Sequence, residues 1–403
     1  MRRYHTGNDF RRAQSIAELA AMARRRLPYF AWEYLDGGAE DELTLRRNRQ
    51  AFAELSLLPQ TLVPCATPDL RRPLFGGTLP LPMAIAPSGY NGMLYRDADL
   101  HLARAAGERG LPFSLSTVST SSLEEVAAAA PDTELWFQLY CLRDPGIQDD
   151  LLRRAEAVGC RTLLLTSDAV LLGNREWDRR NFVRPQQLSW RNKFDVLRHP
   201  RWLLQALWPQ GLPQMANLAP YLPAERRNAA GAAQFIGQQM DTELDWNALA
   251  RLRQRWPHRL LLKGVLAATD ARRCAELGLD GVVVSNHGGR QLDGAPASLD
   301  CLPAVAEAVK GRLAILLDSG IRRGSDILKA CALGADAVLL GRATLYGVAL
   351  GGAAGAAHAL DLLHQELRLA LALLGRRSLA EVNGDCLLRS APASLLPTGD
   401  VHP

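Results

Sequence analysis

The stretch Gly281-Val-Val-Val-Ser-Asn-His-Gly-Gly-Arg-Gln-Leu-Asp-Gly294 contains the pattern that decides the fold. It begins with an apolar run, Val282 to Val284, which is typical of a buried strand. It then changes at once to polar residues and glycines, among them His287 and Arg290. A buried strand that ends in a titratable side chain and a permanent cation indicates a binding site for a small molecule. The alternative is an ordinary turn whose histidine has a structural partner.

The same plan recurs along the chain. A helical segment ends, a glycine supplies the left-handed C-cap, and an apolar strand follows in the runs that start at Arg109, Val158, Leu277 and Leu333. Continuous apolar runs are typical of parallel strands buried on both faces. We predict such strands at residues 83–86, 112–116, 135–139, 162–166, 260–263, 281–285, 314–317 and 337–340.

Helical segments alternate with these strands, so the pattern predicts an α/β fold, a (β/α)8 TIM barrel. An open doubly wound sheet is the alternative. Against it, the first strand runs into Ala86-Pro-Ser-Gly-Tyr-Asn-Gly92, which is not a dinucleotide-binding turn. We expect N-terminal helices and a barrel cap at residues 1–82, the barrel at residues 83–375, and a C-terminal extension with a mobile, Pro- and Ser-rich tail at residues 376–403.

A long insertion, residues 177–240, interrupts the barrel after its fourth strand. Apolar side chains in it stand among Arg191, Lys193, Arg198 and Arg201. Aromatic and aliphatic residues next to basic ones are typical of a segment that lies on a membrane surface, and a lid or subunit contact is the alternative. The apolar residues in question are Trp190, Phe194, Trp202, Leu203, Leu204, Leu207 and Trp208.

Composition narrows the class of protein. The chain has 403 residues, 48% hydrophobic and 22% charged, which suits a globular protein with a large core. The net charge of +5 is spread out, which favours acidic small substrates or an anionic surface over nucleic acid. The seven cysteines are scattered without CxxC spacing, so we expect reduced thiols of a cytoplasmic protein and no metal site. The first ten residues lack the apolar region of a secretory signal, and no run approaches the roughly 20 residues of a spanning helix.

In a TIM barrel the site of function lies where the strands run into the following loops. His287 is suited to accept a proton, Asp168 to stabilise the resulting cation, and two arginines, Arg175 and Arg290, to bind a carboxylate. Lys263, at the end of an apolar run, would be costly to bury without an anionic partner. The ends of the last two strands carry Gly320, Arg322, Gly341 and Arg342, where barrels usually hold a phosphate.

Several of these runs together resemble one family. Ser285-Asn-His-Gly-Gly-Arg-Gln291 resembles the active-site signature of the FMN-dependent α-hydroxy acid oxidases and dehydrogenases. Further matches are Tyr34-Leu-Asp-Gly-Gly-Ala-Glu-Asp41, Trp136-Phe-Gln-Leu-Tyr140 and Asp318-Ser-Gly-Ile-Arg-Arg-Gly324, and the resemblance spans residues 15–388. Within the family the chain is most similar to the membrane-associated (S)-mandelate dehydrogenase branch, on runs such as Gly173-Asn-Arg-Glu-Trp-Asp178.

The resemblance implies a role for each matched residue. His287 is the general base, paired with Asp168; Arg175 and Arg290 bind the substrate carboxylate with help from Tyr34, and Tyr140 binds the hydroxyl. Lys263 stabilises reduced FMN. The remaining cofactor residues are Pro87, Ser88 and Gly89 near flavin N5, Ser116, Gln138, Thr166 and Ser285 around the flavin and ribityl chain, Asp318 at the ribityl hydroxyls, and Gly320, Arg322, Gly341 and Arg342 at the phosphate.

The resemblance also suggests a substrate. Gly89 and Val118 stand where glycolate oxidases carry larger residues, so we expect space above the flavin for a bulky (S)-2-hydroxy acid such as (S)-mandelate, oxidised to the 2-keto acid. Electrons would pass to a membrane quinone or electron carrier, from a homotetramer held peripherally at the inner face of the cell membrane. The alternatives are an FMN-dependent L-lactate dehydrogenase, a phosphate-binding isomerase or aldolase that uses Lys263 as a Schiff base, and a non-catalytic scaffold.

Overall fold

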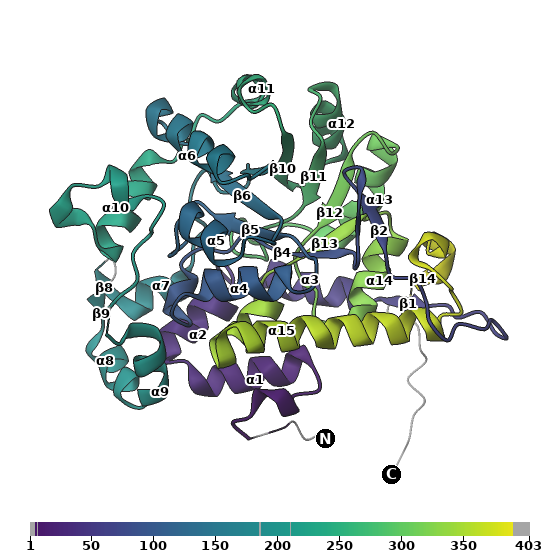
Figure 1. Ribbon diagram of the computed structural model, residues 1–403, viewed down its shortest axis with the longest axis horizontal. Helices are drawn as coiled ribbons and strands as arrows, with labels where there is room; N and C mark the ends of the chain where they lie inside the picture. The colour runs from purple at the N-terminus through teal and green to yellow at the C-terminus, as the bar shows by residue number, and fades with distance from the viewer. Residues whose placement is uncertain (1–4, 6, 185–186, 210, 390–403) are drawn as a thin grey trace, which may run out of the picture.

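A computed structural model describes residues 5, 7–184, 187–209 and 211–389, and Figure 1 shows their arrangement. Eight parallel strands form a closed barrel in chain order, because each strand pairs with the next and the last pairs with the first. The TIM barrel prediction is confirmed, and every predicted strand is present. The strands are β4 (Met83–Ile85), β5 (Phe113–Ser116), β6 (Leu135–Tyr140), β7 (Thr162–Thr166), β10 (Arg259–Val265), β11 (Gly281–Val284), β12 (Ala314–Leu317) and β13 (Ala337–Leu340).

Helices surround the barrel, and their ends follow local capping rules. Ser122 and Glu125 form a capping box at the start of α5, and Asp245 accepts a hydrogen bond from the backbone of Ala248 in α11. The barrel helices are α4 (Ala98–Gly107), α5 (Leu123–Ala129), α6 (Pro145–Ala157), α11 (Trp246–Arg255), α12 (Ala268–Glu276), α13 (Ser298–Val309), α14 (Gly324–Ala332) and α15 (Arg342–Leu373). The last is kinked, since Gly351 and Gly352 leave the helical conformation.

The amino end of the barrel is closed by a hairpin, β2 (Arg72–Leu74) and β3 (Gly77–Leu79). Leu74 and Leu79 join the small core inside the barrel, and the ring of Phe75 packs edge-on against buried Trp136. Because this end is filled by apolar side chains, only the carboxyl end of the barrel can open onto a cavity.

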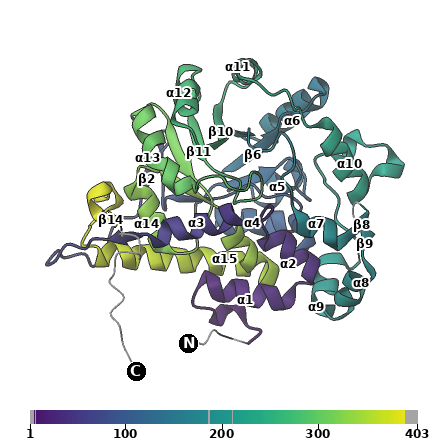
Figure 2. The ribbon, with the colours of Figure 1, turned by 180° about the vertical axis from the view of Figure 1, so that it is seen from behind.

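The N-terminal segment reaches the carboxyl end of the barrel. It forms α1 (Ile16–Arg26), α2 (Tyr29–Asp36) and α3 (Leu43–Ala53), and the views from both sides place α2 and α3 beside the barrel (Figures 1 and 2). The backbone of Ala39 donates to the carbonyl of Gly289, 2.8 Å away. β1 (Leu55–Leu57) pairs with β14 (Leu387–Arg389) from the far end of the sequence, a pairing that the expected helices and barrel cap at residues 1–82 did not include.

The insertion forms a separate group of short elements on one side of the barrel. They are α7 (Glu176–Asn181), β8 (Phe182–Arg184), β9 (Gln187–Leu188), α8 (Trp190–Leu197), α9 (Pro200–Trp202), η3 (Leu203–Leu207) and α10 (Ala229–Gln239). Short 3-10 turns complete the chain at Phe10–Arg12, Asn91–Met93, Ala219–Tyr221, Ala224–Arg226, Leu379–Glu381 and Gly384–Cys386.

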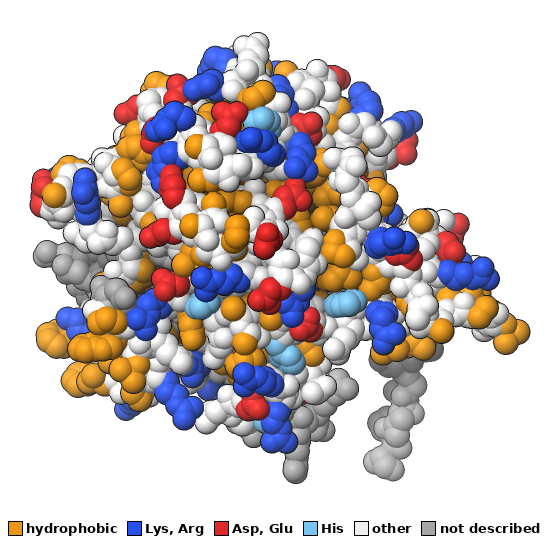
Figure 3. Space-filling model, in the orientation of Figure 1, with side chains coloured by type: hydrophobic (Ala, Val, Ile, Leu, Met, Phe, Trp, Pro, Cys, Tyr) orange, Lys and Arg blue, Asp and Glu red, His pale blue; other side chains and the backbone are white. Residues whose placement is uncertain are grey.

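The apolar residues of the insertion divide into two sets. Trp190, Phe194, Leu204 and Trp208 are exposed, and Figure 3 shows orange side chains gathered over α8 and α9. Trp202 is buried, and its indole nitrogen donates a hydrogen bond to the carbonyl of Met93. Grouping Trp202 with the surface residues of the segment was therefore wrong. Among the described residues, no helix is long and apolar enough to cross a membrane. The mobile tail expected from the sequence falls, from residue 390 onward, outside the described residues.

Candidate active site

A cavity of about 280 Å³ opens at the carboxyl end of the barrel, and residues within or just after the end of every barrel strand line it. Nearly all of the sequence-predicted site residues face this cavity. The two exceptions, Asp168 and Ser285, lie directly behind it and hold residues that do face it: Asp168 contacts His287, and Ser285 accepts hydrogen bonds from Lys263 and from the backbone of His287. The fold therefore brings together the residues that the strand ends and the family resemblance indicated.

His287 and Asp168 form a close pair. Their Nδ1 and Oδ1 atoms are 2.9 Å apart, which leaves Nε2 as the ring nitrogen available to a ligand. Burial lowers the pKa of His287, while Asp168 acts in the opposite direction, so the imidazole is neutral at neutral pH. Burial opposes ionisation of Asp168, but the hydrogen bond with His287 and the positive charge of Lys263 outweigh burial and lower the pKa of Asp168. The arrangement suits a proton acceptor backed by an anion.

The backbone of His287 is unusual as well. Its φ of 58° lies in the left-handed region, which residues other than glycine rarely adopt. The hydrogen bond from its N–H to Ser285 Oγ, 3.0 Å long, helps to hold this conformation. Strained backbone of this kind persists where the surrounding structure over-determines it, and it clusters at functional sites.

Lys263 lines the cavity and is only 3% exposed. Its Nζ contacts Ser285 Oγ at 3.0 Å and Asp318 Oδ2 at 3.2 Å. Burial would lower the pKa of this amine, but the charges of Asp318 and Asp168 outweigh burial and raise it. Lys263 is therefore a fixed cation, which makes it unsuited to act as the neutral amine of a Schiff base.

Two arginines stand on the other side of His287. Arg290 donates to the carbonyls of Tyr34 and Gly37 at 2.8 Å each, and its guanidinium lies 5.2 Å from the centre of the Tyr34 ring. Arg175 donates to the carbonyl of Arg290 and to Gln291 Oε1, at 3.3 Å each. Both arginines line the cavity, where two guanidinium groups can bind an anionic group such as a carboxylate.

Two tyrosines complete this side of the cavity. The hydroxyl of Tyr34 donates to the carbonyl of Gly89 at 2.9 Å. Burial raises the pKa of Tyr140, although Arg175 and Lys263 oppose the rise, so its phenol stays protonated and can donate a hydrogen bond.

Buried polar atoms along the cavity lack protein partners. Ser116 Oγ donates to Gln138 Oε1 at 2.8 Å, which fixes the amide and turns its nitrogen away. Among the described residues, Gln138 Nε2 and Thr166 Oγ1 are buried and have no hydrogen-bond partner. Because buried polar groups are almost always paired, these two atoms fit a polar, planar ligand such as a flavin.

The end of the cavity assigned to a phosphate is shaped by backbone and arginine together. Gly341 precedes the first residue of α15, and a helix N-terminus presents N–H groups to anions. Gly320 has a φ of 93°, and a Cβ there would overlap the carbonyl of Asn48. The guanidinium of Arg342 donates to the carbonyls of Leu35, Gly37 and Gly288, and that of Arg322 lies 5.5 Å from the ring centre of Tyr346.

Several residues that support the site were not among its predicted residues. Gln291 donates to the carbonyls of Asp168 and Leu171 while it accepts from Arg175. Asp99, fully buried on α4, accepts from Asn91, which also donates to Ser88. Only burial in the folded chain makes these side chains recognisable as supports for the site.

The wall of the cavity that faces the insertion is apolar. Its residues come from the loops after β4, β5 and β7 and from the insertion. Gly89 and Val118 are coupled there, because a Cβ on Gly89 would overlap Val118 Cγ2. The space that Gly89 leaves is thus partly taken by Val118, which corrects the expectation that both residues leave open space. The remaining apolar residues of this wall are Leu172, Met215, Ala233, Ile236 and Met240.

Comparisons with known proteins agree with this geometry. The profile of the family described as FMN-dependent dehydrogenase matches residues 23–389. L-lactate dehydrogenase of Acinetobacter baumannii is 41% identical over 396 residues, covering 97% of this chain and 99% of that protein. L-lactate dehydrogenase of Xanthomonas campestris pv. campestris is 43% identical over 391 residues, covering 95% and 99%.

Solved structures give the same picture with another substrate. The crystal structure of the monotopic membrane protein (S)-mandelate dehydrogenase superposes with a TM-score of 0.89 at 40% identity, covering 94% of this chain and 100% of that one. Mandelate oxidase with (S)-4-hydroxymandelic acid gives a TM-score of 0.79 at 35% identity, covering 93% and 98%. The resemblance drawn from the sequence motifs is thereby confirmed at the level of the family.

Proposed function

The chain belongs to the family of FMN-dependent 2-hydroxy acid dehydrogenases, and from that premise we propose that it oxidises (S)-mandelate or a similar aryl 2-hydroxy acid to the 2-keto acid. The observation that carries the reaction type is the His287–Asp168 pair, because His287 lines the same cavity as Arg175 and Arg290. A base next to a carboxylate-binding pair is what oxidation at the carbon adjoining a carboxylate requires.

The residues present fit FMN. Among the described residues, Gln138 Nε2 and Thr166 Oγ1 have no hydrogen-bond partner, so both can bind polar atoms of the flavin. Lys263 carries a fixed positive charge. At the end of the cavity proposed for the phosphate, Gly341 and Arg342 begin a helix. When bound, FMN supplies the acceptor of two electrons. Lys263 favours negative charge on its neighbour, which is a preorganised electrostatic contribution. Residues around Pro87, Ser116, Ser285, Asp318 and Arg322 complete the proposed cofactor site.

The substrate is held by groups of fixed charge and protonation. Arg175 and Arg290 bind its carboxylate, Tyr140 donates to its oxygen, and His287 takes up a proton through Nε2. The new imidazolium is stabilised by Asp168, whose Oδ1 is 2.9 Å from Nδ1. Because the cavity is enclosed by apolar residues on the insertion side, water is excluded from that wall, which strengthens these electrostatic contacts.

The apolar wall supports an aryl side chain. Met215, Ile236 and Met240 from the insertion face the same cavity as His287, so a phenyl ring would meet apolar surface. Methionine is flexible and makes favourable contacts with aromatic rings. A methyl group, as in lactate, would leave much of this wall uncovered.

L-lactate is the second candidate. The relatives from Acinetobacter and Xanthomonas favour it, because both are L-lactate dehydrogenases and this chain matches nearly their whole length. Both substrates would use the same charged residues of the site, so only the apolar wall distinguishes between them.

Steady-state turnover of the purified enzyme with an artificial electron acceptor tests the choice. We expect kcat/KM for (S)-mandelate to exceed that for L-lactate at least tenfold, since one apolar group in a fitted pocket is worth about 10–200-fold. The variant Gly89→Ala, which pushes against Val118, should lower the ratio. A higher kcat/KM for L-lactate would replace the aryl proposal by the lactate one.

The surface of the insertion supports a peripheral membrane location. We propose that the exposed side chains of α8, α9 and η3, led by Trp190, Phe194 and Trp208, enter the membrane interface, and that electrons leave for a membrane quinone or a similar carrier. A homotetramer at the cytoplasmic face, and separate roles for residues 1–82, 83–375 and 376–403, remain part of this proposal.

A further inference from the structure

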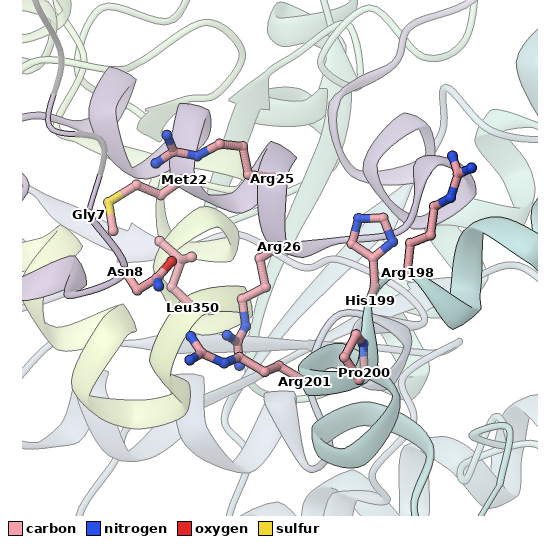
Figure 4. A pocket seen from close by; sticks show the side chains of 10 residues that line it. All are labelled: Gly7, Asn8, Met22, Arg25, Arg26, Arg198, His199, Pro200, Arg201 and Leu350. Carbon is pink, nitrogen blue, oxygen red and sulfur yellow. The ribbon is translucent and has the colours of Figure 1, made fainter.

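A second cavity, also of about 280 Å³, lies outside the barrel between the end of α1 and the turn from α8 to α9 (Figure 4). Basic side chains from both segments line it, Arg25 and Arg26 from α1 and Arg198, His199 and Arg201 from the insertion. Of the residues that the structure describes, none with a carboxylate lines this cavity. Segments far apart in the sequence therefore build one strongly positive pocket.

The arginines of this pocket have no carboxylate partner among the described residues. Within the described part of the chain, none of the four guanidinium groups makes an ion pair or a side-chain hydrogen bond, although most arginines of the barrel do. Asp195, an acidic residue beside the pocket, accepts a hydrogen bond from the backbone of Tyr29, and its Oδ1 lies 3.8 Å from His199 Nδ1. The positive charge of the pocket is therefore left for a ligand.

Two of the arginines reach toward each other. In Figure 4 the guanidinium groups of Arg26 and Arg201 lie together, while Arg25 and Arg198 extend on opposite sides. Burial lowers the pKa of Arg26, and the charge of Arg201 lowers it further. Like charges held together repel each other, and a bound anion with several oxygens would relieve this repulsion. Guanidinium groups bind phosphate in a bidentate fashion, which suits this pair.

We propose that this pocket binds the phosphate group of an anionic membrane phospholipid. The segment that supplies Arg198 and Arg201 also supplies exposed Trp190, Phe194 and Trp208. Basic groups at headgroup level beside apolar groups that enter the membrane are the arrangement of an interfacial segment. The inference rests on the proposed membrane association, and it makes that association selective for anionic lipid.

Vesicle binding of the FMN-loaded enzyme tests the pocket. We expect wild-type protein to sediment with vesicles of phosphatidylcholine and phosphatidylglycerol far more than with phosphatidylcholine alone. Arg26→Gln/Arg201→Gln should lower the partition coefficient on the anionic vesicles roughly thirtyfold, on the scale of about fivefold for each basic residue at a membrane surface. Turnover of the substrate and flavin absorbance should stay unchanged, because neither arginine lines the active-site cavity.

A matched control removes the same charge elsewhere. Arg24 and Arg272 are exposed and lie outside the pocket, so Arg24→Gln/Arg272→Gln should change the partition coefficient less than threefold. If both double variants lost the same share of the partition coefficient on anionic vesicles, the pocket proposal would be overturned, and only a general attraction between the basic protein surface and the anionic membrane would remain. Loss of the native oligomer in the pocket variant alone would overturn it as well, in favour of a subunit contact.

Two further measurements distinguish a lipid phosphate from a soluble phosphate compound, and failure of the pocket from failure of the membrane association. Inorganic phosphate, titrated by calorimetry, should bind more weakly than millimolar. Micromolar binding that the pocket variant abolishes, with vesicle binding unchanged, would assign the pocket to a soluble phosphate compound and overturn the lipid. If wild-type protein binds no vesicle, the proposed membrane association fails with it. If Trp190→Ser/Phe194→Ser abolishes vesicle binding while the pocket variant behaves as wild type, the pocket alone fails.

Discussion

The two cavities of about 280 Å³ use positive charge in opposite ways. In the barrel, Lys263 and His287 each contact a carboxylate, and these pairs are buried. In the pocket between α1 and α9, Arg26 and Arg201 have no acidic partner among the described residues. Pairing in a buried site fixes which groups carry protons, and that is what chemistry requires. Unpaired cations near the surface instead attract an anion.

The largest effect expected from breaking a pair is at His287. His287→Gln keeps a polar side chain but removes the proton acceptor, so kcat should fall about 10²–10⁴-fold. His258, which pairs with Glu156 at the surface, provides the control: His258→Gln should leave kcat unchanged. Steady-state assays with flavin content measured by absorbance would check both. A His287→Gln enzyme within tenfold of wild type would remove His287 from the proposed chemistry.

Substitution of Lys263 tests whether its buried positive charge assists reduction of the flavin. Lys263→Met leaves Asp318 without its cation and removes the charge proposed to lie beside the flavin. We expect the rate of flavin reduction, followed by anaerobic stopped flow, to fall about 10²–10³-fold. Lys310→Met, at an exposed position, should have no effect. An unchanged reduction rate in Lys263→Met would confine the lysine to a structural role.

Asp168 tests the pair through pH dependence. The neutral imidazole is the active form, and burial holds the pKa of His287 below its ordinary value of about 6.5. The pH at which kcat/KM falls off on the acidic side, the acidic limb of the profile, should therefore lie below the ordinary pKa of histidine. Asp168 counteracts this shift, so Asp168→Asn should move the limb to still lower pH and reduce the plateau about a hundredfold. Asp132→Asn, at an exposed carboxylate, should change neither the limb nor the plateau. A limb that moves to higher pH would contradict the pairing.

The barrel could be predicted from the sequence because its strands are continuous apolar runs that end in polar groups. The eight strands, and the gathering of His287, Lys263 and Arg290, follow from that pattern and from the fact that parallel strands of a barrel end on one face. The family motifs added the assignment to FMN, which no spacing of residues could supply.

Contacts between distant segments could not be predicted. The pairing of β1 with β14 joins the two ends of the chain, and the packing of Val118 against Gly89 depends on side-chain positions. Trp202 looked like a surface residue beside its exposed neighbours, yet it donates to Met93 and is buried. The basic pocket, which combines α1 with the insertion, also appears only in the folded chain.

Anaerobic titration of the purified enzyme with (S)-mandelate, followed by flavin absorbance, tests the central claim most directly. The account predicts a yellow protein whose visible absorbance is bleached by (S)-mandelate, with one equivalent of the 2-keto acid formed per flavin and with a slower response to L-lactate. A colourless protein, or flavin that no 2-hydroxy acid reduces, would contradict it.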